Sequence, residues 1–362
     1  MYKKSIPFIL LLGLGAAQAG DIVVRDISGR TVIFAQNPQR IVLGESRLLY
    51  TTAILDREDP LRRIVAWADD LPTTSPDAFN KYKSKFPSST AKIHNLGKQA
   101  NLSAEQLISE KPDIVILTET FHKNYQDSGL LERLDRAHIP YAFVDLREIR
   151  HTVPSIGLLG KVFGQQARAK EFIDFYNKNL NIVTRRVAKI EDRPLVFLDV
   201  AAGNPPDQCC RTYGPYTYGK FIEIAGGRNW GSTLGNKSTI EVNPEAIMEL
   251  NPPFIIATGS AWPNTKAIPL GYAANSVEVN ARMRDLAQRT GFSHLKAIKN
   301  RQFYAIYHQF HNSAYNVFAI QQIAKWLHPK EFSDIDPEAN LKELHRRFLP
   351  IDYSGIFWTQ FK

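Results

Sequence analysis

The stretch Leu102-Ser-Ala-Glu105-Gln-Leu-Ile-Ser-Glu-Lys-Pro112-Asp-Ile-Val-Ile116-Leu-Thr118 has an echo later in the chain, Val242-Asn-Pro-Glu245-Ala-Ile-Met-Glu-Leu-Asn-Pro252-Pro-Phe-Ile-Ile256-Ala-Thr258. Each combines a short amphipathic segment, a Pro that ends it and an apolar run typical of a buried parallel strand. A second echo, in the same order, pairs residues 141–145 with residues 304–308. Unrelated βα units share parts of this pattern, but paired echoes in one order favour two similar α/β lobes.

Three further apolar runs fit the same scheme. They are Arg40-Ile-Val-Leu-Gly44, Arg63-Ile-Val-Ala-Trp67 and Pro194-Leu-Val-Phe-Leu-Asp199. Strands that alternate with helices form parallel sheets whose two faces are covered. The sequence therefore predicts an α/β fold with parallel-rich central sheets.

A long helical pattern lies between the two halves. After Gly164, apolar residues recur every three or four positions, and no Gly or Pro interrupts them before Pro194. This spacing places them on one helical face. A helix over residues 165–191 would be about 40 Å long at 1.5 Å per residue. We expect a rigid strut between the lobes, although a helix of this length is also common inside a single core.

Composition narrows the class of protein. The chain has 362 residues, a formal net charge of +9 and 44% hydrophobic residues, which is ordinary for a globular protein. It has two Cys, too few for a disulfide scaffold or a paired CxxC zinc site. The basic residues are scattered, and no basic helix or aromatic RNA motif accompanies them, so we expect no nucleic-acid partner. No GxSxG, HExxH, P-loop or GxGxxG motif is present, so we do not expect an enzyme.

The N-terminus predicts export. Lys3 and Lys4 precede an apolar run over residues 6–17, and Ala17-Gln18-Ala19 matches a signal-peptide cleavage pattern. The run is shorter than the roughly 20 residues that span a bilayer, which disfavours the alternative of an uncleaved anchor. We expect residues 1–19 to be removed and the mature protein to lie in the periplasm.

Several segments in order resemble one family, the periplasmic substrate-binding proteins of ABC importers for iron–siderophore, haem and cobalamin. The opening Asp21-Ile-Val-Val-Arg-Asp-Ile-Ser-Gly29-Arg-Thr-Val and Asn37-Pro-Gln-Arg40-Ile-Val resembles that of these proteins. The later matches are Leu107-Ile-Ser-Glu-Lys-Pro112-Asp-Ile-Val, Leu134-Asp-Arg-Ala-His-Ile-Pro140, Gly219-Lys-Phe-Ile-Glu-Ile-Ala-Gly226-Gly-Arg-Asn229 and Ala324-Lys-Trp-Leu-His-Pro329-Lys-Glu-Phe. Their order covers nearly the whole mature chain and is more specific for the family than for its ligand.

The resemblance implies two Rossmann-like lobes joined by one long α-helix, with the ligand in the cleft between them. We accordingly divide the chain into a signal peptide (1–19), an N-terminal lobe (20–150), linking helices (151–192) and a C-terminal lobe (193–362). The implied function is capture of a ferric chelate, most simply a siderophore, and delivery to an inner-membrane permease. Haem or cobalamin is the alternative cargo, and a sensor or adhesion module is the alternative of another class. We expect a monomer.

The resemblance also implies permease docking through one surface Glu on each lobe. The two family positions correspond here to Tyr50 and Lys220. Glu45 and Glu223 lie close to them in the sequence, and we expect these two carboxylates to take over the docking role.

The carboxyl ends of the predicted strands locate the cleft, because open α/β sheets bind ligands there. Aromatic faces stack on planar ligand groups, and Arg pairs with anionic oxygens at two points. Such a mixture suits a bulky, partly anionic iron chelate, whose chelator fills the iron shell and leaves no need for protein metal ligands. The strand ends offer Arg47, Trp67, Phe121 and His122 in the first lobe and Trp262, Tyr307, His308 and His311 in the second.

The loop Asp207-Gln-Cys209-Cys210-Arg211-Thr-Tyr213-Gly-Pro-Tyr216-Thr-Tyr218-Gly is the most unusual stretch. We interpret Arg211, Tyr213 and Tyr216 as ligand contacts, the alternative being a surface loop whose tyrosines pack on the lobe. Export permits a disulfide between Cys209 and Cys210, although adjacent cysteines must distort the backbone to pair. Two free buried thiols are the alternative.

The nine His residues are spread along the chain. A direct zinc or manganese site gathers three or four His and carboxylates, and no such cluster is visible, so we expect no metal site. A His near a strand end is commonly a hydrogen-bonded structural residue. If the cargo is haem, Tyr213, Tyr216 or His308 is the expected axial ligand.

Overall fold

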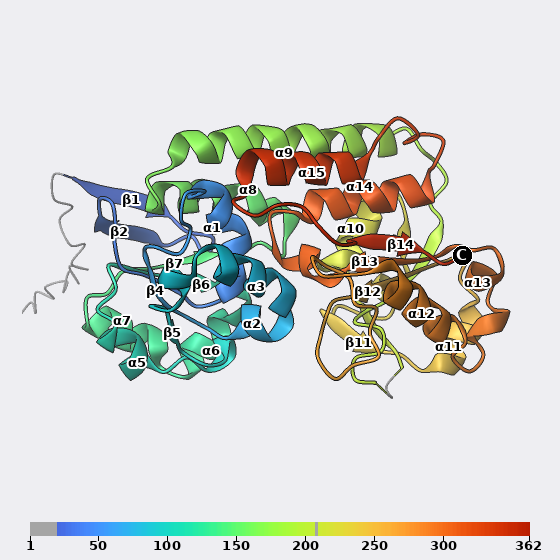
Figure 1. Cartoon of the computed structure of the whole chain (residues 1–362), viewed down its shortest axis with the longest axis horizontal. Coiled ribbons are helices and arrows are strands. Elements are labelled where there is room, and N and C mark those ends of the chain that lie inside the picture. Colours follow the sequence, from blue (N-terminus) through green and yellow to red (C-terminus); the bar gives the residue numbers. More distant parts are fainter. Residues whose placement is uncertain (1–19, 207–208) are drawn as a thin grey trace, which may run out of the picture.

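The structure, a computed structural model, describes residues 20–206 and 209–362. These residues form two lobes side by side, the N-terminal lobe in blue to teal and the C-terminal lobe in yellow to orange (Figure 1). The predicted leader, residues 1–19, lies outside the described residues, as do Asp207 and Gln208. Within the described ranges, no helix is long and apolar enough to cross a membrane.

The N-terminal lobe is built on a five-stranded sheet of order β5-β4-β3-β6-β7. Every pairing in it is parallel, as the continuous apolar runs predict. A separate hairpin, β1 (Asp21–Arg25) and β2 (Thr31–Ala35), precedes it. The sheet strands are β3 (Ile41–Leu43), β4 (Ile64–Trp67), β5 (His94–Asn95), β6 (Ile114–Thr118) and β7 (Tyr141–Val144). The helices are α1 (Leu49–Leu55), α2 (Asp70–Thr74), α3 (Pro76–Lys85), α4 (Pro87–Thr90), α5 (Ala104–Ser109), α6 (His122–Asp127) and α7 (Leu130–Arg136).

The C-terminal lobe has a sheet of order β10-β8-β12-β13-β14. Its pairings are parallel except that of β14 with β13. A separate two-stranded ribbon is formed by β9 (Arg211–Tyr213) and β11 (Thr239–Glu241). The sheet strands are β8 (Leu195–Asp199), β10 (Arg228–Asn229), β12 (Phe254–Gly259), β13 (Phe303–Tyr307) and β14 (Trp358–Gln360). The helices are α10 (Tyr218–Ile224), α11 (Pro244–Leu250), α12 (Ser276–Ala287), α13 (Lys296–Lys299), α14 (Asn316–Leu327) and α15 (Pro337–Phe348).

The two sequence echoes fall on equivalent strands. The first echo is α5 and β6 in one lobe and α11 and β12 in the other. The second is β7 and β13, each of which lies directly beside the first-echo strand in its own sheet. The prediction of two similar α/β lobes with parallel-rich sheets is therefore confirmed.

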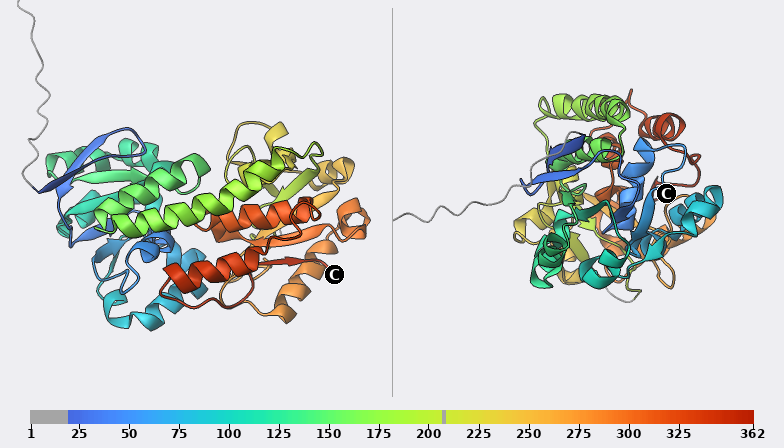
Figure 2. Two further views of the ribbon diagram at one scale, coloured as in Figure 1. Left: turned by 90° about the horizontal axis from the view of Figure 1, so that it is seen from above. Right: turned by 90° about the vertical axis from the view of Figure 1, so that its left-hand side faces the viewer.

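Helix α9 (Gln166–Val187) runs along both lobes, as Figure 2 shows. It follows α8 (Ile149–Val162) after a break at Gly164, whose φ is +63°. One face of α9, including Phe172, Tyr176 and Val183, is buried. The predicted long helix is therefore present, although it ends at Val187, four residues short of the expected position, where Ala188 caps the last turn.

The C-terminal segment adds a second connection that the sequence analysis did not foresee. After α15, the chain lies against the N-terminal lobe, and cations of that lobe donate to its backbone carbonyls. Arg57 Nε donates to Leu349 O at 2.9 Å and Lys81 Nζ to Asp352 O at 2.7 Å. Carbonyl groups at a helix C-terminus carry partial negative charge, so cations there are stabilising. The lobes are therefore tied by more than one helix.

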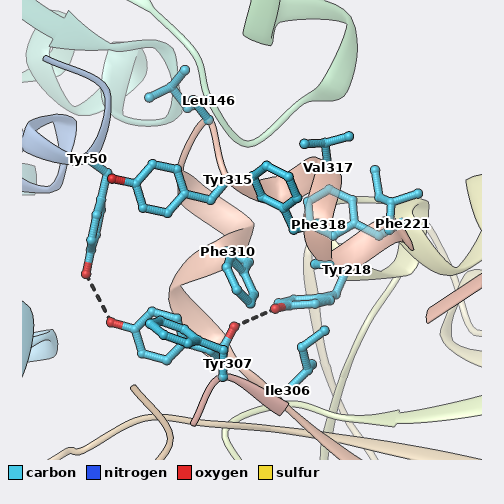
Figure 3. Close-up of a cluster of buried hydrophobic side chains, with 14 of the residues drawn as sticks. Tyr50, Leu146, Tyr218, Phe221, Ile306, Tyr307, Phe310, Tyr315, Val317 and Phe318 are labelled. Carbon is cyan, nitrogen blue, oxygen red and sulfur yellow. Dashed lines mark hydrogen bonds between the residues drawn. The ribbon is translucent and has the colours of Figure 1, made fainter. Parts of the chain in front are cut away.

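The two lobes also share one apolar core. Tyr50 of α1 and Tyr307 of β13 are buried, and their hydroxyl groups lie 3.1 Å apart (Figure 3). The Tyr218 hydroxyl donates to Tyr307 O at 2.5 Å, and the Tyr50 and Tyr315 rings meet edge to face at 5.5 Å. Because these contacts are desolvated, separating the lobes in this region means exposing a continuous cluster of aromatic side chains.

Candidate functional site

A cavity of about 250 Å³ lies between the lobes. It is found where the carboxyl ends of β3, β8, β12 and β13 face one another. The sequence analysis predicts a ligand cleft at this place, because open α/β sheets bind ligands at the carboxyl ends of their strands. Five predicted contacts line it: Arg47, Arg211, Tyr213, Trp262 and His308. Six residues that the sequence analysis missed line it as well: Thr74, Val200, Ala201, Asn204, Thr239 and Gln309.

Arg47 links the N-terminal wall of the cavity to the opposite lobe. Its Nε donates to Asp70 Oδ2 at 2.8 Å, and its Nη2 lies 2.6 Å from Glu45 Oε1. Its Nη1 reaches across the lobes to Gln309 Oε1 at 3.2 Å. Asp70 is itself fixed by the backbone N–H of Ser46 at 2.7 Å. The guanidinium is therefore held in one orientation at the cavity floor.

Glu45 is the buried centre of this charge network and is not a surface residue. It is 0% exposed, pairs with Arg47 and with Arg147 at 3.5 Å, and accepts a hydrogen bond from Asn312 of the other lobe. Burial raises the pKa of Glu45, but the two arginines and Asn312 outweigh it and hold the pKa below its usual value. A carboxylate enclosed in this way has no surface to offer a permease, so the docking role expected for Glu45 is corrected.

Arg147 is a charged residue near the cavity that the sequence analysis overlooked. It follows β7 closely, and its guanidinium lies 5.8 Å from the ring of Phe121, a predicted contact. The carboxyl end of the strand over residues 141–144 would have led to Arg147, but the sequence analysis did not consider that strand end. The guanidinium groups of Arg47 and Arg147 are thus paired with the buried carboxylates of Glu45 and Asp70, and Arg211 adds a third guanidinium at the cavity.

His308 and His311 contribute uncharged imidazoles at the same place. His308 Nδ1 lies 2.8 Å from Thr258 Oγ1, and its ring lies 5.0 Å from Trp262. His311 Nδ1 donates to His308 O at 2.7 Å, and its ring lies 6.4 Å from Tyr213. Burial and the neighbouring guanidinium groups lower the pKa of His308 to about 3 and that of His311 well below its usual value. Both rings are therefore neutral near pH 7 and present nitrogen lone pairs.

Arg211 and Tyr213 are held by strand β9, which the two cysteines precede. Cys209 and Cys210 form a disulfide, so the disulfide alternative is the one that the structure contains. Arg211 donates through Nη2 to Asn204 O, and burial raises the pKa of Tyr213. The ribbon partner β11 aligns Glu241 with Arg211 and Thr239 with Tyr213.

Four predicted contacts, Trp67, His122, Tyr216 and Tyr307, are not among the residues that line the cavity, and neither are Phe121 and His311. Tyr307 is 1% exposed in the interlobe core, because its strand turns it inward toward Tyr50. Trp67 packs inside its own lobe with its ring 6.2 Å from Phe79. His122 stacks on Phe143 at 4.3 Å. The remaining one, Tyr216, donates through its hydroxyl to Asn236 in a surface loop.

The chain matches the profile of the periplasmic binding proteins over residues 58–309. This match covers well over half of the sequence. The chain belongs to the periplasmic binding protein family. Membership implies an extracytoplasmic location.

Two relatives stand out among those similar to this periplasmic binding protein. The high-affinity heme uptake system protein IsdE of Staphylococcus aureus (strain Newman) is 24% identical over 262 residues, 72% of this chain and 79% of the relative. The crystal structure of the TroA-like periplasmic binding protein FepB from Veillonella parvula superposes with a TM-score of 0.87 and 29% identity, covering 94% of this chain and 100% of that one.

A third relative shares the fold alone. MolA of Haemophilus influenzae, solved with molybdate, has a TM-score of 0.70 and 18% identity over 92% of this chain and 99% of that one. In the present periplasmic binding protein, the described residues contain no group of three or more His, Cys, Asp and Glu arranged to hold a metal ion.

Proposed function

We propose that this protein is the solute-binding component of an ABC importer that captures a ferric chelate, of the siderophore class, in the cavity between its lobes. The observation that carries the proposal is that the guanidinium groups of Arg47 and Arg211 line this cavity, and that Arg147 shares the buried carboxylate of Glu45 with Arg47. Arg pairs with carboxylate, catecholate or hydroxamate oxygens at two points, and its planar group stacks on rings.

The aromatic residues of the cavity support the same class of cargo. Trp262 and Tyr213 offer flat apolar faces, which suit the rings or the amide planes of a chelator. An iron ion that its chelator already surrounds needs complementary charge and shape rather than protein ligands. This fits a site whose cations are held by buried carboxylates.

The size of the cavity indicates how the cargo enters. Its volume of about 250 Å³ lies below the roughly 300–1,000 Å³ of pockets that enclose drug-sized ligands. The contact of Arg47 Nη1 with Gln309 Oε1 at 3.2 Å closes the cavity between the lobes. A bulky chelate therefore enters only when the lobes move apart at this contact, and α9 and the C-terminal segment restrict that movement to a small opening.

The permease would contact both lobes on the cavity side. Glu223 remains the proposed docking carboxylate of the C-terminal lobe, because its side chain is 32% exposed. It pairs with Lys220 at 3.1 Å and accepts from Ser232 Oγ at 2.9 Å, so it is oriented at the surface.

Titration of tryptophan fluorescence tests the cargo. The protein is mixed with ferric complexes of a catecholate, a hydroxamate and a carboxylate chelator, and with haemin and cobalamin. We expect saturable quenching by an anionic ferric chelate, and at least about a tenfold loss of affinity in Arg211→Ala, since a hydrogen bond to a charged group is worth about 1.5–3 kcal/mol. Arg282→Ala, on the outer helix α12, is the matched control. Binding of cobalamin alone, or unchanged binding by Arg211→Ala, contradicts the proposal.

Haem is the second candidate cargo, and one observation favours it. His308, His311 and Tyr213 bring uncharged nitrogen and phenolic oxygen donors to one cavity, and haem iron accepts His or Tyr as an axial ligand. The relative from S. aureus is a heme uptake protein by name. If haem is the cargo, haemin mixed with the protein gives a shifted Soret band, and His308→Ala or Tyr213→Phe alters that band. Ferric chelates then do not compete with haemin for binding.

A further inference from the structure

The Cys209–Cys210 disulfide directly precedes Arg211 of the interlobe cavity, and Cys209 lines a second cavity in the C-terminal lobe. The second cavity has a volume of about 490 Å³, and Cys209, Leu286, Arg289 and Phe292 are among the residues that line it. Cys209 is half-buried, whereas Cys210 is 4% exposed. A small molecule in this cavity therefore reaches the Cys209 sulfur first.

Arg289 fixes a positive charge against both sulfur atoms. Its Nη1 lies 3.4 Å from Cys209 Sγ and 3.5 Å from Cys210 Sγ. Its Nη2 is anchored on Asp199 Oδ2 at 2.5 Å, and its guanidinium lies 4.0 Å from the centre of the Phe292 ring. A cation in contact with sulfur stabilises a thiolate, and a better-stabilised thiolate leaves a disulfide faster.

The same disulfide is joined to the wall of the interlobe cavity. Cys210 N donates to Val242 O at 3.1 Å, and Val242 N donates to Cys210 O at 2.8 Å. The next residue, Arg211, begins β9, and its carbonyl accepts from Val200 N at 2.7 Å. Arg211 and Val200 both line the interlobe cavity. The backbone position of the cysteines thus determines where Arg211 lies.

We propose that Cys209–Cys210 is a thiol–disulfide exchange site for a dithiol reductant, approached through the second cavity, and that its reduction loosens β9. One thiolate of the reductant attacks Cys209 Sγ, and the bond to Cys210 Sγ breaks. The Cys210 thiolate leaves beside Arg289 and later takes up a proton. The second thiolate of the reductant then attacks the reductant sulfur that is bonded to Cys209 Sγ. This closes a disulfide within the reductant and releases the Cys209 thiolate. One disulfide is reduced, the dithiol is oxidised to a disulfide, and its two protons pass to the two cysteines.

The exchange is measured on the whole folded protein without any cargo, so its outcome is independent of the proposed function. The protein is incubated with dithiothreitol, a small dithiol, and quenched with iodoacetamide, and the intact mass counts the alkylated thiols. We expect reduction of the native protein, slowed about threefold to tenfold in Arg289→Gln. Arg289→Lys keeps the charge and should restore most of the rate. Arg284→Gln, which removes an exposed cation of α12 that does not line the second cavity, should behave as the wild type.

Hydrogen exchange tests the link to the cavity wall. Reduction should speed amide exchange in residues 211–213 about twofold to tenfold, the range set by the net worth of one backbone hydrogen bond. The double variant Cys209→Ser/Cys210→Ser should exchange as the reduced protein does and should not respond to the dithiol. A disulfide that is reduced only when the protein unfolds, an unchanged rate in both Arg289 variants, or equal amide exchange in the two redox states overturns the proposal.

Discussion

Substituting Glu45 by Gln distinguishes a buried charge centre from a surface docking carboxylate. The change keeps the size of the side chain and removes its negative charge. Arg47 and Arg147 then keep only Asp70 as an acidic partner, although Glu45 lies 2.6 Å and 3.5 Å from the two guanidinium groups. Because this site is fully buried, solvent cannot screen the uncompensated positive charge.

The expected loss of stability is large. Removing one partner of a buried ion pair costs about 3–5 kcal/mol. The roughly 340 described residues have an unfolding entropy of about 0.7 kcal/mol/K, so the midpoint of thermal unfolding should fall by about 4–7 °C. Calorimetry or circular dichroism measures this shift. The same variant should bind an anionic ferric chelate at least as tightly as the wild type, because the cavity becomes more positive.

Glu223→Gln is the matched control, since it removes a carboxylate that is partly exposed at the surface. A surface substitution of this kind changes stability by about 0.5 kcal/mol or less, which is a shift of under about 1 °C. Equal midpoints for Glu45→Gln and the wild type would refute the burial argument and restore Glu45 as a docking candidate.

Three further predictions follow from buried or clamped groups. The pKa of His308 is about 3 in the native state, against 6.5 for an unperturbed imidazole. Between these two pH values only the unfolded state binds a proton at this residue, so the free energy of unfolding falls as the pH falls through this range. At about pH 5 the free energy of unfolding should be about 2 kcal/mol lower because of His308. Urea unfolding should show that this pH-dependent loss is absent in His308→Gln. It should persist in the control His94→Gln, which replaces an exposed imidazole. Tyr50→Phe and Tyr307→Phe should couple by about 0.5–1.5 kcal/mol in a double-mutant cycle, and additive effects would argue against the interlobe hydroxyl contact. Arg57→Met should lower stability by about 1 kcal/mol and speed amide exchange at the end of α15, whereas unchanged exchange there would mean that the cation does not clamp this segment.

The fold was largely predictable because its signals are local. Apolar runs located β3, β4, β6, β8 and β12, and three-or-four spacing located α9. The return of the C-terminal segment to the N-terminal lobe was not predictable. It depends on Arg57 and Lys81 finding the carbonyls of Leu349 and Asp352, and such contacts leave no periodic pattern.

The site was predictable only in part. The strand ends and the loop over residues 207–219 located the cavity and five of its lining residues, whereas Arg147, which closely follows the strand at residues 141–144, was missed. The sequence could not show which side chains at a strand end point toward the cavity and which point into the core. Tyr307 and His308 are neighbours, yet the first lies in the core and the second on the cavity. Successive residues point to opposite sides of a strand, and the choice of side depends on what packs against it.

The sequence by itself determined the class of fold, the duplication of the lobes and the place of the interlobe cavity, because hydrophobic periodicity and chain breakers act over a few residues. The tertiary structure alone decided that Glu45 is enclosed, that Cys209 and Cys210 are joined beside Arg289, and that Arg47 and Arg211 of different lobes line one cavity. These features depend on distances between residues far apart in the chain, and the strength of a charge contact depends on whether water surrounds it.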